Sequence, residues 1–218
     1  MGAAELKDKA TLLPMLTKTV KQLESDFFTI PDDRKEPLLQ LAQFVRERIS
    51  MGQIASLNFI CTHNSRRSHM AQLWAQAAAN YYGIPGVECY SGGTEATAFN
   101  TLAVEALRNL GFLIRQISEG DNPTYVVMFS KETPPLKAFS KKYNDPSNPA
   151  RNFAAIMTCS HADENCPLVV GASLRIAITY DDPKDFDGTS QEEIKYRERA
   201  LQIGREMLYA FSQVSSKL

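Results

Sequence analysis

A cysteine and an arginine six positions apart carry the side chains best suited to chemistry in this sequence. Cys61 and Arg67 bound the stretch Cys-Thr-His-Asn-Ser-Arg-Arg, which lies between a mostly apolar run at 57–60 and a helical pattern from Met70 to about Tyr82. Backbone N–H groups at the start of a helix favour an anion in such a turn. They also favour the thiolate form of a cysteine there, while an arginine can donate two parallel hydrogen bonds to an oxyanion. The stretch therefore predicts nucleophilic attack on a tetrahedral oxyanion such as phosphate or arsenate.

A Cys-x5-Arg match alone would also fit an ordinary buried cysteine before a helix. Three features favour the catalytic interpretation: the flanking strand and helix patterns, the hydroxyl of Ser68 beside the arginine, and a second cysteine-containing segment. We call residues 61–68 the oxyanion loop.

The second segment contains Cys159 and Cys166, seven residues apart. If it is helical, both thiols lie on one face but about 10 Å apart along the axis, whereas a disulfide needs Cα atoms within about 7 Å. A redox pair would therefore require the segment to unwind, and two unrelated thiols remain the alternative. Together with His161 the pair could form a metal site, but no Cys-x2-Cys spacing is present, so we expect no bound metal. The remaining thiol, Cys89, lies within a predicted strand and is expected to be buried and inert.

The chain as a whole has the composition of an ordinary globular protein. It has 218 residues, enough for one large or two small domains, and a formal net charge of -1 that suggests no nucleic-acid partner. No apolar run is long enough to cross a membrane, and residues 1–8 lack the apolar core of a signal peptide. Four cysteines are too few for a disulfide framework, so we expect a cytoplasmic protein.

Strand patterns alternate with helical patterns from residue 56 onward. The expected strands are 56–60, 87–91, 153–158 and 174–179, and the expected helices are 67–82, 99–110 and 190–213, the last opened by a capping box from Ser190 to Glu193. This alternation predicts an α/β fold, a flavodoxin-like four-stranded parallel sheet with helices on both faces.

The remaining segments are expected to add to that sheet. Residues 1–55 predict a helical hairpin, an N-terminal extension whose second helix starts at 31–33, and 56–218 form the main domain with an insert at about 119–150. Within 112–150 we expect strands at 112–114 and 125–129, one or two helical turns at 136–142, and a solvated face for Lys141 and Lys142.

Three reactive side chains follow the ends of predicted strands. Cys61, Cys159 and Asp182 each come directly after, or within a few residues of, such an end. Because ligands of parallel sheets bind outside the carboxyl ends of the strands, we expect these three groups to meet at one rim.

The stretch 61–71, Cys-Thr-His-Asn-Ser-Arg-Arg-Ser-His-Met-Ala, resembles the active-site loop of the low-molecular-weight protein tyrosine phosphatase superfamily. Within it, the chain most resembles the thioredoxin-coupled arsenate reductases. The shared motifs are Tyr-Ser-Gly-Gly at 90–93, Cys-Ser-x-Ala-Asp-x-Asn-Cys-Pro at 159–167 and Asp-Asp-Pro at 181–183. The similarity spans about 56–118 and 153–214, and phosphatases of this fold lack the second cysteine segment.

The resemblance implies a role for each matching residue. Cys61 is the expected nucleophile, Ser68 a hydrogen-bond partner of its thiolate, and Asn64 the residue that shapes the loop. Asp182 is the expected general acid, with Asp181 as the fallback. The expected oxyanion-binding residues are Thr62, His63, Asn64, Ser65, Arg66, Arg67 and Ser68.

The resemblance also implies a thiol relay. Cys159 would attack the Cys61 adduct, release arsenite and leave a Cys61–Cys159 disulfide, and Cys166 would then pair with Cys159. Thioredoxin or a similar external dithiol would reset the enzyme, with no bound cofactor.

Several residues depart from the family pattern. His63 stands where relatives usually have Gly, and Arg66 adds a second positive charge that could bind an oxyanion or pair with an acidic residue. Gln72 replaces a potassium-binding Glu, so a potassium site is not expected. Lys184 stands where tyrosine phosphatases commonly place an aromatic residue, which favours the reductase.

Two other interpretations remain. A phosphatase acting on phosphotyrosine or small phosphoesters would use Cys61, Arg67 and Asp182 and leave the cysteine pair idle. A catalytically silent oxyanion sensor or binding module would act through the N-terminal hairpin, which could also mediate homo-oligomerisation.

Overall fold

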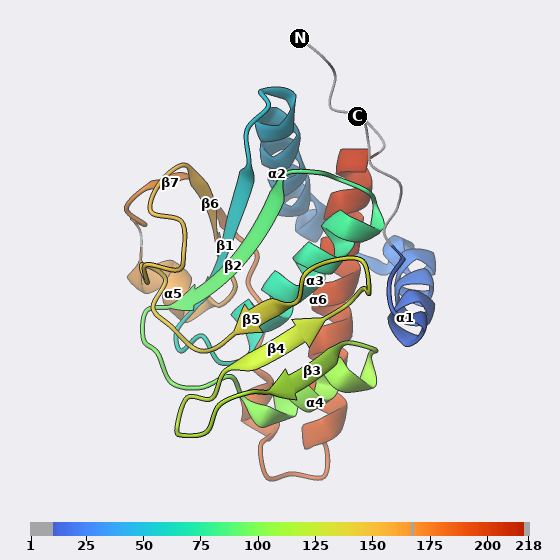
Figure 1. The fold of residues 1–218 in the computed structure, drawn as a ribbon, viewed down its shortest axis with the longest axis vertical. Coiled ribbons are helices and arrows are strands. Elements are labelled where there is room, and N and C mark those ends of the chain that lie inside the picture. The colour runs from blue at the N-terminus through green and yellow to red at the C-terminus, as the bar shows by residue number, and fades with distance from the viewer. Residues whose placement is uncertain (1–10, 167, 216–218) are drawn as a thin grey trace.

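A four-stranded parallel sheet organises the chain (Figure 1). The computed structural model describes residues 11–166 and 168–215. The sheet has the order β2-β1-β6-β7, with bounds Ala55–Cys61 (β1), Val87–Gly93 (β2), Phe153–Met157 (β6) and Ala172–Ala177 (β7). The helices are α1 (Pro14–Ser25), α2 (Asp32–Ser50), α3 (Arg67–Tyr81), α4 (Thr101–Asn109), α5 (Ser160–Asn165) and α6 (Glu192–Ser215), with 3₁₀ turns η1 (Phe27–Thr29) and η2 (Pro183–Phe186). The predicted α/β fold with a four-stranded parallel sheet is confirmed.

The two faces of the sheet are covered differently. Side chains alternate along a strand, so Leu57 and Phe59 of β1 face the large core formed with α2, α3 and α6. Ile60 belongs to a smaller cluster on the other face, with Met157 and Val169. There α5 is the only covering helix within the described residues, and the irregular segment 143–150 covers the rest. Helices therefore flank the sheet on both sides, but unequally.

The N-terminal helices are part of the main core. Helix α2 begins at Asp32, as the Pro-Asp-Asp start signal predicts, and packs against α6 and β7. Arg34 of α2 donates to the carboxylate of Glu206 on α6 through Nε at 3.0 Å and Nη2 at 2.6 Å, and Glu206 is buried. The apolar faces of α1 and α2 are thus buried against other elements of the same chain.

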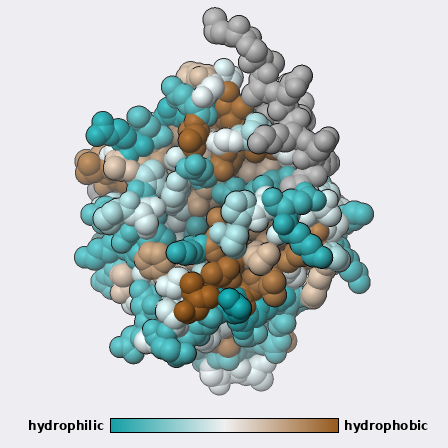
Figure 2. Space-filling model, in the orientation of Figure 1, coloured by the Kyte–Doolittle hydropathy of each residue, from teal (hydrophilic) through white to brown (hydrophobic). Residues whose placement is uncertain are grey.

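A second, antiparallel sheet has the order β3-β4-β5; the strands predicted at 112–114 and 125–129 are confirmed as β3 and β4, and β5 is the strand that the sequence did not predict. Its strands are Leu113–Gln116 (β3), Tyr125–Met128 (β4) and Leu136–Ala138 (β5). The prediction of helical turns at 136–142 is wrong, because Leu136 and Ala138 pair with Val127 and Tyr125 of β4. Two prolines at 134–135 favour extended backbone, and pairing with β4 then decides the structure. Figure 2 shows hydrophobic side chains gathered over this sheet, where Leu113 is exposed.

The start of the last helix also differs from the prediction. Helix α6 begins at Glu192, so Ser190 is not its N-cap. The turn before it is held by the Gly188 N–H, which donates to the Glu192 carboxylate at 2.6 Å, and by the Gln191 N–H, which donates to Thr189 Oγ1 at 3.2 Å. Within the described ranges, no helix combines the length and apolarity needed to span a membrane.

Candidate active site

The oxyanion loop connects β1 to α3. Strand β1 ends at Cys61, one residue beyond its predicted end, and α3 begins at Arg67, as predicted. The loop backbone is held from outside, since the Glu95 N–H donates to the Thr62 carbonyl at 2.8 Å and the Ser140 hydroxyl to the His63 carbonyl at 2.9 Å. The segments that follow β2 and β5 thus lie against the loop and fix its path.

Asn64 is the residue around which the loop closes. Its φ of 45° lies in the left-handed region, which Asn tolerates better than most residues. Its side-chain amide donates to Ser68 Oγ at 2.9 Å and accepts the Lys141 backbone N–H at 2.9 Å. Ser68 Oγ lies 3.1 Å from Cys61 Sγ. Because Asn64 supplies a proton to the Ser68 oxygen, the Ser68 proton is free to point at sulfur and stabilise a thiolate.

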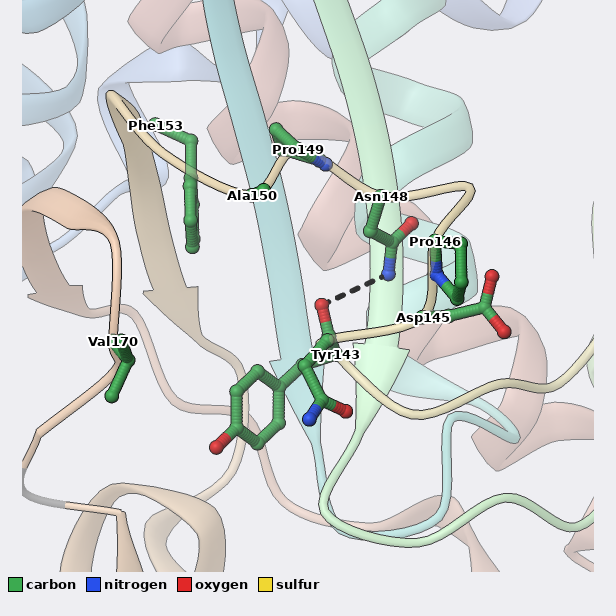
Figure 3. A pocket seen from close by; sticks show the side chains of 9 residues that line it. Tyr143, Asp145, Pro146, Asn148, Pro149, Ala150, Phe153 and Val170 are labelled. Carbon is green, nitrogen blue, oxygen red and sulfur yellow. Dashed lines mark hydrogen bonds between the residues drawn. The ribbon is translucent and has the colours of Figure 1, made fainter.

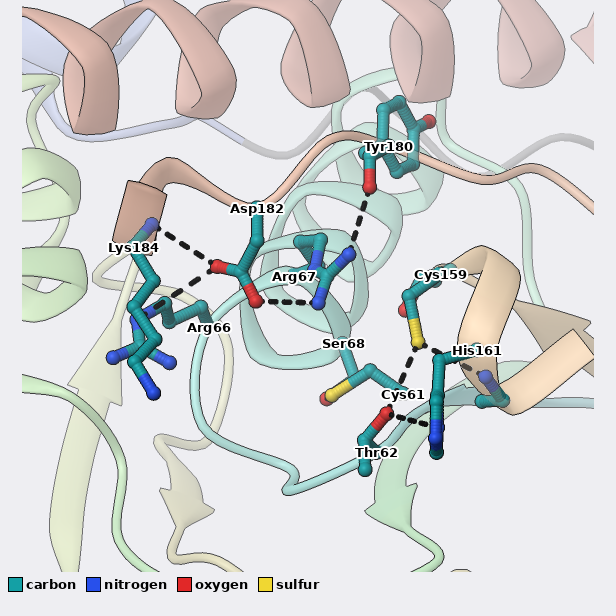
Figure 4. Close-up of polar contacts among 12 residues, drawn as sticks. Cys61, Thr62, Arg66, Arg67, Ser68, Cys159, His161, Tyr180, Asp182 and Lys184 are labelled. Carbon is teal, nitrogen blue, oxygen red and sulfur yellow. Dashed lines mark hydrogen bonds and ion pairs between the residues drawn. The ribbon is translucent and has the colours of Figure 1, made fainter. Parts of the chain in front are cut away.

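An arginine–aspartate pair covers the mouth of the loop (Figure 4). Arg67 donates through Nη1 to the Tyr180 carbonyl at 2.9 Å and through Nη2 to Asp182 Oδ2 at 2.5 Å. A small hollow there, about 10 Å³, is lined by Cys61, His63, Ser65, Arg66, Arg67 and Asp182. That volume suits roughly one water. A tetrahedral oxyanion would therefore have to displace Asp182 from Arg67 and take its place on the guanidinium.

Asp182 faces this hollow and Asp181 does not. Asp182 Oδ1 also accepts the Lys184 N–H at 3.2 Å, which fixes the carboxylate at the start of η2. The Asp181 side chain is almost fully exposed and pairs with Arg199 at 3.1 Å. The geometry favours Asp182 as the acid.

The two unusual loop residues pair with acidic side chains. Arg66 donates to the Tyr196 hydroxyl at 2.8 Å and lies 3.6 Å from Asp187, so it pairs with acids while still lining the hollow. His63 lies 3.6 Å from Glu95. The position of positive φ is Asn64, the next residue along.

Cys159 lies beside the oxyanion loop. It follows β6 as the N-cap of α5 and is buried, and the preceding Thr158 N–H donates to the Ile60 carbonyl at 2.7 Å. Its sulfur lies 3.5 Å from Thr62 Oγ1 and belongs to the same apolar cluster as Cys61. Figure 4 shows the Cys61 sulfur turned toward Ser68 and the Cys159 sulfur turned toward Thr62. The structure thus brings Cys61 together with Asp182 around the hollow and with Cys159 in one apolar cluster.

Cys166 is not brought to Cys159 in this conformation. It is partly exposed and follows α5, so a complete short helix separates the two thiols. Arg175 of β7 fastens that helix, with Nη2 2.5 Å from the Asp163 carboxylate and Nε donating to the Cys166 carbonyl at 3.1 Å. All four cysteines are free thiols. A Cys159–Cys166 disulfide requires α5 to unwind, as its length predicts.

Burial shifts the pKa of two further side chains, Cys89 and Lys141. Burial raises the pKa of the Cys89 thiol well above its usual value, consistent with the expected inert role. Lys141 contradicts the expected solvated face, since it is buried while Lys142 is exposed. Burial lowers the pKa of Lys141 to about 8, and its ammonium lies 4.7 Å from the Phe139 ring centroid. The sequence shows only a pair of lysines and carries no signal for this difference.

A larger cavity, about 430 Å³, lies elsewhere (Figure 3). It is lined by segment 143–150 with Phe153 and Val170, and none of the predicted site residues lines it. Across the part of the chain that the structure describes, no three His, Cys, Asp or Glu side chains form a group that could hold a metal ion.

Comparisons with known proteins bear on the same region. The family model for low molecular weight phosphotyrosine protein phosphatase matches residues 56–122, which include the whole oxyanion loop. An arsenate reductase of Halalkalibacterium halodurans is 29% identical over 135 residues, covering 62% of this chain and 78% of the relative. Arsenate reductase 2 of Staphylococcus epidermidis is 31% identical over 130 residues, covering 59% and 78%. The solution structure of a low molecular weight protein tyrosine phosphatase from Bacillus subtilis aligns with a TM-score of 0.48 at 16% identity, covering 74% of this chain and 97% of that one.

Proposed function

This chain belongs to the arsenate reductases of the low-molecular-weight phosphotyrosine protein phosphatase superfamily, and from this membership we propose that it reduces arsenate to arsenite with its own thiols. The proposed cycle uses Cys61 as nucleophile, Cys159 as the second thiol and Cys166 as the third.

In the first step the Cys61 thiolate attacks arsenic(V) and an arsenate oxygen leaves as water. Arg67 and the loop N–H groups hold the remaining oxygens, and Asp182 donates the proton to the leaving oxygen. The 2.5 Å contact between Asp182 and Arg67 supports this division of roles, because an oxyanion on the guanidinium would have the carboxyl beside it.

In the second step the Cys159 sulfur attacks Cys61 Sγ. A sulfur–sulfur bond forms, the sulfur–arsenic bond breaks, and its electron pair stays on arsenic, which leaves as arsenite. The two thiols lose two electrons and arsenic gains two. Cys166 then attacks Cys159 and frees Cys61, which requires α5 to unwind. An external dithiol such as thioredoxin reduces the Cys159–Cys166 disulfide by exchange, and the cycle belongs in the cytoplasm, where thiols are kept reduced.

One observation carries the proposal: Cys159 is buried against the oxyanion loop, with its sulfur 3.5 Å from Thr62 Oγ1, the residue next to Cys61. A phosphatase has no use for a thiol in that place. The test is a single turnover, in which reduced protein is mixed with arsenate in the absence of other reductant. The proposal predicts one arsenite and one disulfide per chain, and neither from Cys61→Ser. Arsenite release by Cys61→Ser would place the nucleophile elsewhere.

Phosphoester hydrolysis is the second candidate. Cys61, Arg67 and Asp182 suffice for it, and the matching family model is that of a phosphatase. Hydrolysis of para-nitrophenyl phosphate without any arsenite release would favour this activity over arsenate reduction.

A further inference from the structure

Arsenite release in the proposed function requires that Cys159 lose its proton, and this inference rests on that function. A thiolate, not a thiol, attacks sulfur. Cys159 is only 1% exposed, so water has little access to remove its proton. One backbone group helps to stabilise negative charge there, because the Ala162 N–H donates to the Cys159 sulfur at 3.4 Å. The proton itself needs an acceptor close by.

The structure connects Cys159 to a base by two contacts. Its sulfur lies 3.5 Å from Thr62 Oγ1, and the same oxygen lies 3.2 Å from Nδ1 of His161 on α5 (Figure 4). A hydroxyl both accepts and donates, so Thr62 can accept from the thiol while it donates to the imidazole. His161 is exposed, which lets it pass a proton on to water.

We propose that His161 accepts the Cys159 proton through the Thr62 hydroxyl as Cys159 attacks the Cys61 adduct. The Cys159 proton moves to Thr62 Oγ1, and the Thr62 proton moves to His161 Nδ1, which becomes imidazolium. The thiolate forms the bond to Cys61 Sγ and the sulfur–arsenic electron pair stays on arsenic. The imidazolium then returns its proton to solvent. His161 must start as the Nε2–H tautomer.

No other base in the described residues is joined to this hydroxyl. The carboxylate of Asp163, also on α5, is 2.5 Å from Arg175, and that of Asp182 is bound to Arg67. Both are therefore engaged by guanidinium groups. Among the residues that the structure describes, the side chains within hydrogen-bond distance of Thr62 Oγ1 are those of Cys159 and His161.

The experiment measures single-turnover arsenite release by reduced full-length protein for His161→Ala and His161→Gln. We expect about 100-fold slower release in both, the usual contribution of a positioned proton acceptor. Gln preserves a hydrogen bond to Thr62 but cannot take a proton. Added imidazole should speed arsenite release by His161→Ala at least tenfold, because it can enter from solvent the space that the side chain leaves. It should not change the rate of wild type. Glu164→Gln, an exposed change on the same helix, is the matched control and should release arsenite like wild type.

Each other outcome has a distinct meaning. Arsenite release by the variants at the wild-type rate overturns the His161 proposal and leaves the proposed function intact. Slow release that imidazole does not restore also overturns it, since His161 would then only hold Thr62 in place. Hydrolysis of para-nitrophenyl phosphate, measured on the same samples, verifies that the oxyanion loop is folded. If wild type itself releases no arsenite, the proposed function fails first.

Discussion

Replacing Lys141 by methionine should stabilise the protein at neutral pH. The side chain is 6% exposed, and burial lowers its pKa from 10.5 to about 8. At about 1.4 kcal/mol for each tenfold change in proton affinity, keeping this ammonium charged in the folded state costs about 3 kcal/mol. Loss of its contact with the Phe139 ring offsets about 1 kcal/mol, so Lys141→Met should gain about 2 kcal/mol at pH 7.

The gain should depend on pH in a defined direction. Below pH 8 the lysine is charged in both states and the full cost is present. Between pH 8 and 10.5 the folded protein has lost the proton while the unfolded chain keeps it, so wild-type stability rises relative to the variant. The advantage of Lys141→Met therefore shrinks from pH 8 upward and is gone near pH 10.5.

Urea unfolding at pH 7, 8, 9 and 10 under reducing conditions measures this difference. Groups common to both proteins cancel in the comparison, and the Lys141 backbone contacts to Asn64 and Gly93 do not depend on its side chain. Lys142→Met is the matched control, exposed and one residue away, with an expected change within about 0.5 kcal/mol. A Lys141→Met difference that stays constant from pH 7 to 10 would refute the reasoning, because the ammonium would then not be desolvated.

Three further changes test the site. Asp182→Asn should slow para-nitrophenyl phosphate hydrolysis about 100-fold. It should slow phenyl phosphate hydrolysis more, because phenolate is a poorer leaving group and depends more on protonation by the acid. Equal losses with both substrates would mean that the carboxylate only positions Arg67. Arg175→Met removes the fastening of α5, so amide hydrogen exchange at 160–166 should accelerate by at least tenfold, and unchanged exchange would show that the helix does not depend on it. Gly93→Ala places a Cβ 2.6 Å from the Thr62 carbonyl oxygen and should cost about 2 kcal/mol of stability in urea unfolding. A cost below about 0.5 kcal/mol would mean that the loop yields freely to the added methyl group.

The sequence predicted those parts of the site that depend on the local periodicity of strands and helices. Alternating strands and helices define a parallel sheet, and its carboxyl edge brings together residues as distant as Cys61, Cys159 and Asp182. The position of Cys61 before a helix likewise followed from adjacent residues. Each of these depends on short-range periodicity and on one general rule of sheet topology.

The parts that sequence missed depend on long-range contacts. Strand β5 forms because it pairs with the edge of β4. Residues 136–142 by themselves do not indicate that this edge lies beside them. Lys141 is buried because its backbone binds Asn64, 77 positions away, while Lys142 next to it stays exposed. The contact between Thr62 and His161 spans 99 positions, and nothing in either segment alone indicates it.

Arsenate-dependent NADPH oxidation, with thioredoxin and thioredoxin reductase supplied, tests the central claim most directly when wild type is compared with Cys159→Ser. Three-thiol reduction predicts steady oxidation by wild type, none by Cys159→Ser, and para-nitrophenyl phosphate hydrolysis by both. Arsenate-dependent oxidation that persists in Cys159→Ser, or that is absent from wild type while phosphatase turnover proceeds, would contradict it.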